Sequence, residues 1–148
     1  MQNLPLILKP SKIKSIILIL ISIGFIYLGI KLLEKNMLIA VLNIFFFGIC
    51  LIIFVINMIP NASYLKIGER GIEMKNLFKT TFIPWQVVSG FKTKFIFVNK
   101  LVTFTIDEKL LESSKMRGKT GAFPDTYGMS AKNLANLLNE YKVKFDTF

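Results

Sequence analysis

The sequence predicts a membrane-spanning helical hairpin followed by an α+β domain, a small antiparallel β-barrel or sandwich capped by a C-terminal amphipathic helix. Three observations predict it. Two apolar blocks precede Pro60, apolar and polar residues alternate in the segments that follow, and an apolar stripe at helical spacing begins after Ser130. With 148 residues, the chain has room for one soluble domain besides the membrane part. We therefore divide it into a basic N-terminus (1–14), a hairpin (15–60) and a domain (61–148).

Two apolar blocks define the hairpin. The first has 16 uncharged residues from Ser15 to Ile30, and the second has no charge in the 30 residues from Asn36 to Leu65. About 20 apolar residues cross a bilayer, so we expect spans at about 15–33 and 37–59. A signal peptide would need a small-residue cleavage site, and a soluble core helix would need a polar face. The first block is not followed by such a cleavage site, and neither block has a polar face.

Lysine and arginine near the ends of the spans predict the orientation. Three lysines precede the first span, and four basic residues follow the second within 20 residues. Positive residues favour the cytoplasmic side, so we expect both termini in the cytoplasm. The excess of lysine over arginine, 17 to 2, is typical of AT-rich bacterial genomes, and we expect the protein in a bacterial inner membrane. The polar groups inside the spans are Ser22, Asn43 and Cys50, and we expect them to serve helix packing rather than transport.

Composition excludes several kinds of chemistry. The chain has no histidine, which removes Ser-His-Asp and Cys-His catalysis and histidine-ligated zinc. Its one cysteine, Cys50, cannot form a disulfide within the chain. The net charge is +10, and the surplus of basic residues lies on both sides of Pro60. We expect no cofactor.

The polar part begins with strands. "YLKIGERGIEMK" predicts a hairpin with one core face, and "TTFIPW" predicts a short strand that ends at Pro84. The core face of this hairpin would hold Leu65, Ile67, Ile72 and Met74. Trp85 then follows as a core plug, with an anchor at the membrane interface or a ligand-stacking residue as the alternatives.

The clearest hairpin is "FKTKFIFVNKLVTFTID". A turn at Asn99–Lys100 would pair Val98 with Leu101, Phe97 with Val102 and Phe95 with Phe104. The predicted core face is Phe95, Phe97, Val102, Phe104 and Ile106. The outer end of the other face, with Ile96, Val98, Leu101 and Lys100, is either covered by the rest of the domain or an apolar, basic-edged tip for lipid or a partner.

The last third of the chain predicts two helices. Asp107 is a candidate N-cap for a short helix that stops near Gly118, and a loop follows. Ser130 would cap the final helix, which docks on the sheets. Its apolar stripe is Leu134, Leu137, Leu138, Tyr141 and Phe145.

The charged residues in and near the segment 107–119 allow two kinds of site. Asp107, Glu108 and Glu112 could do acid–base work or hold Mg²⁺, but the start of a helix explains acidic residues without an active site. A basic loop of Lys109, Lys115, Arg117 and Lys119, together with Lys92 and Lys94, could contact anionic headgroups or simply be a solvated face. Nucleic acid is disfavoured, because we expect the phenylalanines to lie in the core.

The segments "YLKIGERGIEMKN", "FIPWQVVSGF" and "GMSAKNLANLLNEY", after two N-terminal spans, resemble a family of uncharacterised bacterial two-span membrane proteins. Their cytoplasmic part resembles the pleckstrin-homology (PH)-like domains. The resemblance implies a curved barrel of about seven strands capped by a helix, and a role in assembly or interaction. A last strand before the helix would be reduced, since "GAFPDTYGM" is short.

The sequence thus predicts a non-enzymatic, membrane-anchored binding or assembly module. The alternatives are an immunity protein against a membrane-active bacteriocin and an enzyme that uses Asp107, Glu108 and Glu112. We expect the bilayer, a protein partner and anionic lipid headgroups as contacts, with homo-oligomerisation left open. The candidate contact residues are Lys92, Lys94, Ile96, Val98, Lys100, Leu101, Lys109, Lys115, Arg117 and Lys119.

Overall fold

The chain divides into two compact units. The computed structural model describes residues 3–112 and 117–147. One unit is Ser11–Ala62, and the other joins Met1–Pro10 to Ser63–Phe148. Residues 3–10 therefore belong to the polar domain, in addition to the segment 61–148 that the sequence predicts.

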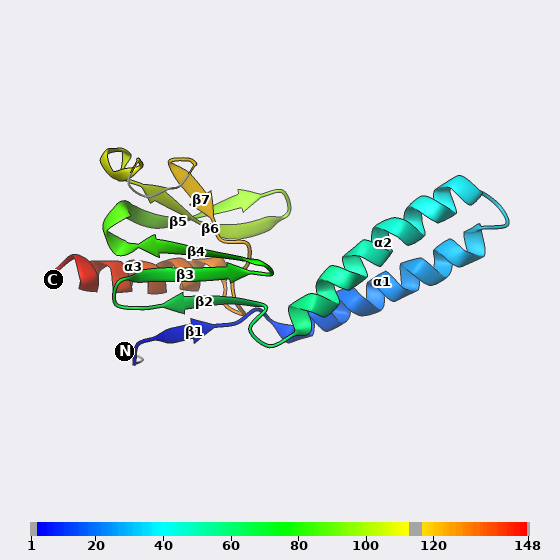
Figure 1. Ribbon diagram of the computed structural model, residues 1–148, viewed down its shortest axis with the longest axis horizontal. Helices are drawn as coiled ribbons and strands as arrows, with labels where there is room; N and C mark the ends of the chain where they lie inside the picture. Colours follow the sequence, from blue (N-terminus) through cyan, green and yellow to red (C-terminus); the bar gives the residue numbers. More distant parts are fainter. Residues whose placement is uncertain (1–2, 113–116, 148) are drawn as a thin grey trace. The chain divides into compact units, whose positions relative to one another are not determined.

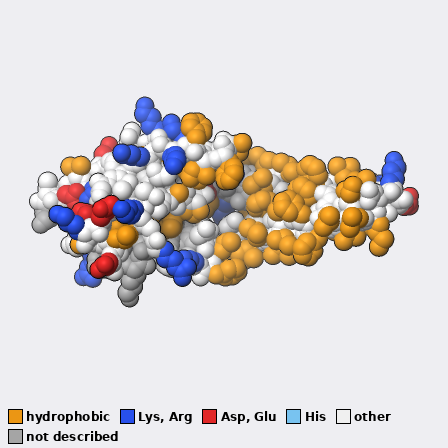
Figure 2. Space-filling model, turned by 90° about the horizontal axis from the view of Figure 1, so that it is seen from above, with side chains coloured by type: hydrophobic (Ala, Val, Ile, Leu, Met, Phe, Trp, Pro, Cys, Tyr) orange, Lys and Arg blue, Asp and Glu red, His pale blue; other side chains and the backbone are white. Residues whose placement is uncertain are grey.

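The smaller unit is a pair of long helices, α1 (Lys12–Leu32) and α2 (Met37–Met58). Their bounds match the predicted spans to within three residues. Both are long and apolar enough to cross a membrane, with mean hydropathies of 2.4 and 3.0. Apolar side chains cover the face of this pair that Figure 2 shows. Asn36 caps α2, since its side chain accepts a hydrogen bond from the main-chain N–H of Ile39.

Asn43 and Gly29 lie where the two helices pack against each other. Asn43 Nδ2 donates a hydrogen bond of 2.8 Å to the main-chain oxygen of Phe25 on the facing helix. Ser22 donates to the main-chain oxygen of Leu18 within its own helix. A Cβ on Gly29 would lie 2.8 Å from Asn43 Nδ2, so the helices approach each other closely at this glycine.

The polar domain contains two antiparallel sheets and a helix (Figure 1). The first sheet has the order β1 (Leu6–Leu8), β2 (Ser63–Ile67), β3 (Gly71–Asn76) and β4 (Lys79–Pro84). The second has the order β5 (Val88–Ile96), β6 (Asn99–Ile106) and β7 (Thr120–Ala122). A 3₁₀ turn, Trp85–Val87, connects the sheets, and α3 (Ala131–Asp146) ends the chain. Among the described residues the two sheets do not join into a closed barrel.

One hydrophobic core holds the domain together. The β2–β3 hairpin places Leu65, Ile67 and Ile72 in it, as the alternation predicts, with Met74 packed at its margin. The second sheet and α3 complete it with Phe91, Val102, Phe104, Ile106, Leu134, Leu138 and Tyr141. Ser130 caps α3 by accepting from the N–H of Asn133, which confirms the predicted start of the helix.

Trp85 is the core plug that the sequence favours. Its side chain is buried, and its Nε1 donates to the main-chain oxygen of Gly68 at 2.9 Å. Its ring stacks on Phe145 with centroids 5.5 Å apart. Lys142 of α3 donates from Nζ to the main-chain oxygen of Trp85 and to Asp146, which ties the helix to the turn between the sheets.

The predicted register of the β5–β6 hairpin is wrong. Phe95 pairs with Lys100 and Ile96 with Asn99, so the turn is Phe97–Val98 rather than Asn99–Lys100. The partner of Phe104 is Phe91, and burial of this pair sets the register. The outer part of the hairpin extends past the core, so Phe95 and Phe97 are exposed instead of buried.

Two short strands complete the sheets. Sequence reasoning missed β1, whose Leu6 and Leu8 pack against the core while Ile7 faces outward. It pairs with β2 although both long helices lie between them in the chain. The reduced last strand is present as β7. Part of the helix predicted after Asp107 falls on residues 113–116, outside the described residues. The described part forms a 3₁₀ turn, Glu108–Leu110, which Asp107 caps by accepting from the N–H of Lys109.

Candidate functional site: two apolar hairpin tips

The β5–β6 turn exposes two apolar side chains at its apex. Phe97 is 99 % exposed and Val98 is 88 % exposed, and we call this pair the FV tip. Phe97 has φ of 56°, the left-handed region, which two-residue hairpin turns usually fill with glycine or asparagine. A phenylalanine in this conformation costs free energy and gains no packing in return. The local fold therefore does not explain this residue.

The β3–β4 turn repeats this construction. Its two residues, Leu77 and Phe78, form what we call the LF tip. Leu77 has φ of 53°, and the side chain of Phe78 is 87 % exposed. The N–H of Leu77 donates to Oγ of Ser63, the first residue of β2, at 3.3 Å. The LF tip thus lies beside the point at which the chain enters the domain from α2.

Both tips lie at one end of the domain. Figure 1 shows the β3–β4 and β5–β6 turns at the end where β1 finishes and β2 begins. The register agrees for the first sheet, because Ser63 pairs with Asn76 immediately before the LF tip, and Leu8 pairs with Leu65. Two exposed apolar apices and both connections to the helices therefore share one end.

Positive charge surrounds the tips. Residues 74–106, which include both turns, contain five lysines and no aspartate or glutamate. The ammonium of Lys100 lies 5.7 Å from the ring centroid of Phe95, and that of Lys75 lies 6.0 Å from the ring of Tyr64. Lys79 and Lys94 are exposed on the neighbouring strand ends. We call Lys75, Lys79, Lys94 and Lys100 the tip lysines.

The predicted contact residues fall into two groups that the structure separates. The first group, Lys92, Lys94, Ile96, Val98, Lys100 and Leu101, lies on the β5–β6 hairpin. The second group, Lys109, Arg117 and Lys119, lies at the other end of β6, where the N–H of Ile106 donates to the oxygen of Lys119. Eight residues of strand, roughly 25 Å, separate the two ends of β6. Lys92 pairs with Thr103 and lies between these ends. Lys115 lies outside the described residues.

The second group is a weaker candidate for binding an anionic partner, because part of its positive charge is neutralised within the domain. Lys119 forms an ion pair with Glu108, so part of its charge is compensated. Glu112 lies exposed nearby in the chain. The tip lysines are therefore the stronger of the two groups by charge, because no ion pair is formed by them among the described residues.

Sequence reasoning missed three phenylalanines of the site. The predicted register puts Phe95 and Phe97 in the core, and alternation alone gives Phe78 no role, yet all three are exposed. A signal was present, because each turn holds two adjacent apolar residues close to an asparagine and a lysine, which flank the pair in "NLFK" and follow it in "FVNK". Apolar residues at a turn are unusual, since turns favour glycine, asparagine, aspartate and proline.

Two of the three residues of the predicted acidic site have structural roles. Asp107 caps the 3₁₀ turn, and Glu108 pairs with Lys119. Within residues 3–112 and 117–147, no three metal-ligating side chains come together.

Two tyrosines have raised pKa values. The pKa of Tyr64 is raised by its hydrogen bond to Glu73, by burial and by the charge of that carboxylate. Burial, and then the charge of Asp125, raises the pKa of Tyr127.

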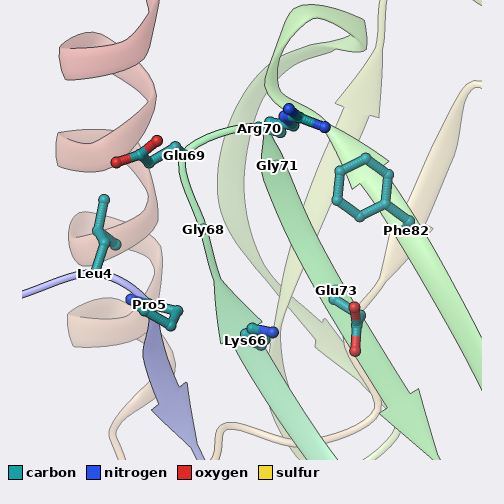
Figure 3. A pocket seen from close by; sticks show the side chains of 9 residues that line it. All are labelled: Leu4, Pro5, Lys66, Gly68, Glu69, Arg70, Gly71, Glu73 and Phe82. Atoms are coloured by element: carbon teal, nitrogen blue, oxygen red, sulfur yellow. The ribbon is translucent and has the colours of Figure 1, made fainter.

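A shallow pocket of about 260 Å³ lies at the β2–β3 turn. Figure 3 shows Leu4 and Pro5 on one side of Gly68, with Arg70 and Phe82 on the other. Its lining residues are Leu4, Pro5, Lys66, Gly68, Glu69, Arg70, Gly71, Glu73 and Phe82. Two acidic and two basic side chains balance in charge, and the carboxylate of Glu73 accepts from the Tyr64 hydroxyl. The tips, with exposed aromatic groups and uncompensated charge, are the stronger candidate.

Comparison with known proteins identifies no relative. No protein-family model, curated protein or solved structure matches the chain.

Proposed function

We propose that this protein is a non-enzymatic binding module anchored in a bacterial inner membrane, and that its polar domain binds in the cytoplasm through the two hairpin tips. The observation that carries the proposal is the pair of exposed apolar turns, FV and LF, at one end of the domain. Each holds a residue in a costly backbone conformation and exposes a phenylalanine to solvent. Exposed apolar groups clustered in this way are typical of interaction sites.

The two helices support the membrane anchor. Helices in a soluble core bury most of their surface, whereas only 11% and 6% of the apolar windows of α1 and α2 are buried. Their lengths of 21 and 22 residues fit a bilayer. The lysines that flank them favour termini on the cytoplasmic side.

The topology of the domain supports the PH-like assignment. Sheets of four and three antiparallel strands followed by a C-terminal helix agree with the seven strands and capping helix that the resemblance implies. The helical hairpin is then an insertion between the first two strands of this domain. A fold of this kind supports binding but does not name the partner.

Photo-crosslinking in native membranes tests the proposal. A benzoylphenylalanine replaces Phe97 in the full-length protein, and Gln86 carries the same group as the matched control. Both side chains are exposed, but Gln86 lies in the turn between the sheets, away from the tips. We expect light-dependent adducts, protein or lipid, from position 97 and far fewer from position 86. Equal yields at the two positions, or no adduct at 97, would overturn the tips as the binding site.

A further inference from the structure

We propose that the surface recognised by the FV and LF tips is the anionic phospholipid face of the membrane that holds the protein. This inference rests on the binding role proposed above and names its ligand class. Phe78, Phe97 and Val98 enter the interfacial layer, and the tip lysines bind the phosphate groups of the lipids around them.

The lengths of the linkers keep the tips near a bilayer. Residues 9–11 join β1 to α1, and residues 59–62 join α2 to β2. Each residue spans at most about 3.5 Å, so the longer linker reaches no more than about 15 Å. Ser63 follows this linker directly and accepts the hydrogen bond from Leu77 in the LF tip. Once the helices span a membrane, the LF tip cannot lie far from its surface.

The order of chemical groups along each hairpin matches the order of layers in a bilayer. Apolar side chains occupy the two apex positions, and lysines follow on the adjoining strand ends. A bilayer presents anionic phosphates outside and hydrocarbon beneath, and amphipathic elements bind it by burying apolar groups below a basic ring. Two separate apices suit a continuous lipid surface, whereas a folded protein would need two matched cavities.

The distribution of charge in the domain favours the same end. The 33 residues from Met74 to Ile106 carry no carboxylate, so nothing within them would repel an anionic surface. The acidic residues Glu69 and Glu73 lie at and beside the β2–β3 turn, and Asp107 and Glu108 follow the far end of β6. The two hairpins that carry the tips therefore combine exposed apolar groups and lysines without a carboxylate between residues 74 and 106.

Fluorescence in nanodiscs tests this inference on the full-length protein. In a Cys50→Ser background, Phe78→Cys, Val98→Cys and Gln86→Cys each carry an environment-sensitive label. The discs contain phosphatidylcholine with phosphatidylglycerol, and brominated acyl chains serve as quenchers. We expect quenching at positions 78 and 98 to exceed that at 86 by at least about twofold, because only groups in the interfacial layer meet the acyl chains.

A matched pair of charge reversals tests the role of the lysines. Lys94→Glu with Lys100→Glu changes the net charge by the same amount as Lys109→Glu with Arg117→Glu at the other end of β6. The first pair should abolish the quenching of the label at position 98, and the second should leave it unchanged. Discs of phosphatidylcholine alone, or high salt, should reduce the quenching as the first pair does.

The outcomes separate this inference from the proposed function. Labels at 78 and 98 that are quenched no more than the label at 86 would overturn lipid contact. A protein adduct from position 97 in the crosslinking experiment would then leave the binding role in place with a different ligand. Quenching that is indifferent to lipid charge and to both reversals would overturn the part assigned to the lysines.

Discussion

The side-chain amide of Asn139 forms two hydrogen bonds with the main chain of Phe91. Its Oδ1 accepts from the N–H of Phe91 at 3.1 Å, and its Nδ2 donates to the oxygen of Phe91 at 3.0 Å. β5 is an edge strand, and a bulge between Val88 and Gly90 interrupts its pairing with β6. Asn139 thus acts as a substitute strand partner for Phe91, and α3 satisfies the free edge of β5 at this residue.

Replacing Asn139 with alanine should destabilise the domain. Two main-chain groups beside a buried side chain would lose their partner, at a cost of about 2 kcal/mol in the free energy of unfolding. The fluorescence of Trp85, the one tryptophan of the chain, reports this unfolding during denaturation in detergent micelles. Asn136→Ala, one turn earlier and exposed, is the control and should have almost no effect. Equal losses in the two variants would show that Asn139 does not support the edge.

Leu6→Ala should destabilise the polar domain, although the two long helices separate Leu6 from the rest of this domain along the chain. The side chain of Leu6 packs against the core through β1, and its truncation should cost about 1–2 kcal/mol, less than for a fully buried leucine. The neighbouring Ile7 is half-exposed on the other face, so Ile7→Ala is a matched control. The same measurement of Trp85 fluorescence applies. If Ile7→Ala were as costly as Leu6→Ala, the pairing of β1 with β2 would be in doubt.

Gly29→Ala should separate the long helices, whereas Gly24→Ala should not. A Cβ at position 29 would lie 2.8 Å from both Asn43 Nδ2 and Ile44 Cγ1, but one at position 24 meets nothing within 4 Å. Overpacking of this kind costs about 1–3 kcal/mol. Far-ultraviolet circular dichroism during thermal unfolding in micelles should show a lower transition for Gly29→Ala only. A shift of the same size for both variants would contradict close packing at Gly29.

Ionisation of the Tyr127 hydroxyl should lower the stability of the domain at alkaline pH. Its hydroxyl is buried and has no hydrogen-bond partner among the described residues. Its pKa is raised in the folded state, so the unfolded chain loses the proton first as the pH rises above the ordinary value of 10.0. The contribution to stability is therefore complete below about pH 10 and declines above it.

Tyr127→Phe should remove both the loss of stability at alkaline pH and the unpaired buried hydroxyl. We expect a gain of about 1 kcal/mol at neutral pH and a shallower decline of the free energy of unfolding above pH 10. Tyr64→Phe is the control, because Tyr64 also has a raised pKa but donates to Glu73. That variant should lose stability at neutral pH. A Tyr127→Phe protein with an unchanged alkaline profile would assign the decline to other groups.

Local patterns in the sequence were enough to predict the elements whose partners lie nearby in the chain. Uncharged runs predict α1 and α2, because length and hydropathy are properties of single segments. Alternation around Gly68–Gly71 predicts the β2–β3 hairpin, and Ser130 with its apolar stripe predicts α3. In each of these elements the residues that decide the structure are separated by only a few positions.

Only the tertiary structure decided the positions of β1 and of the two tips. Three residues in β1 are too few for a period, and its partner β2 begins after both long helices. The register of β5 and β6 depends on burying Phe91 against Phe104 and Phe123, and this burial moves the turn to Phe97–Val98. A period of two shows which residues share a face but not where the core ends along a strand. That limit depends on elements packed from elsewhere in the chain, and it is what leaves Phe95 and Phe97 in solvent.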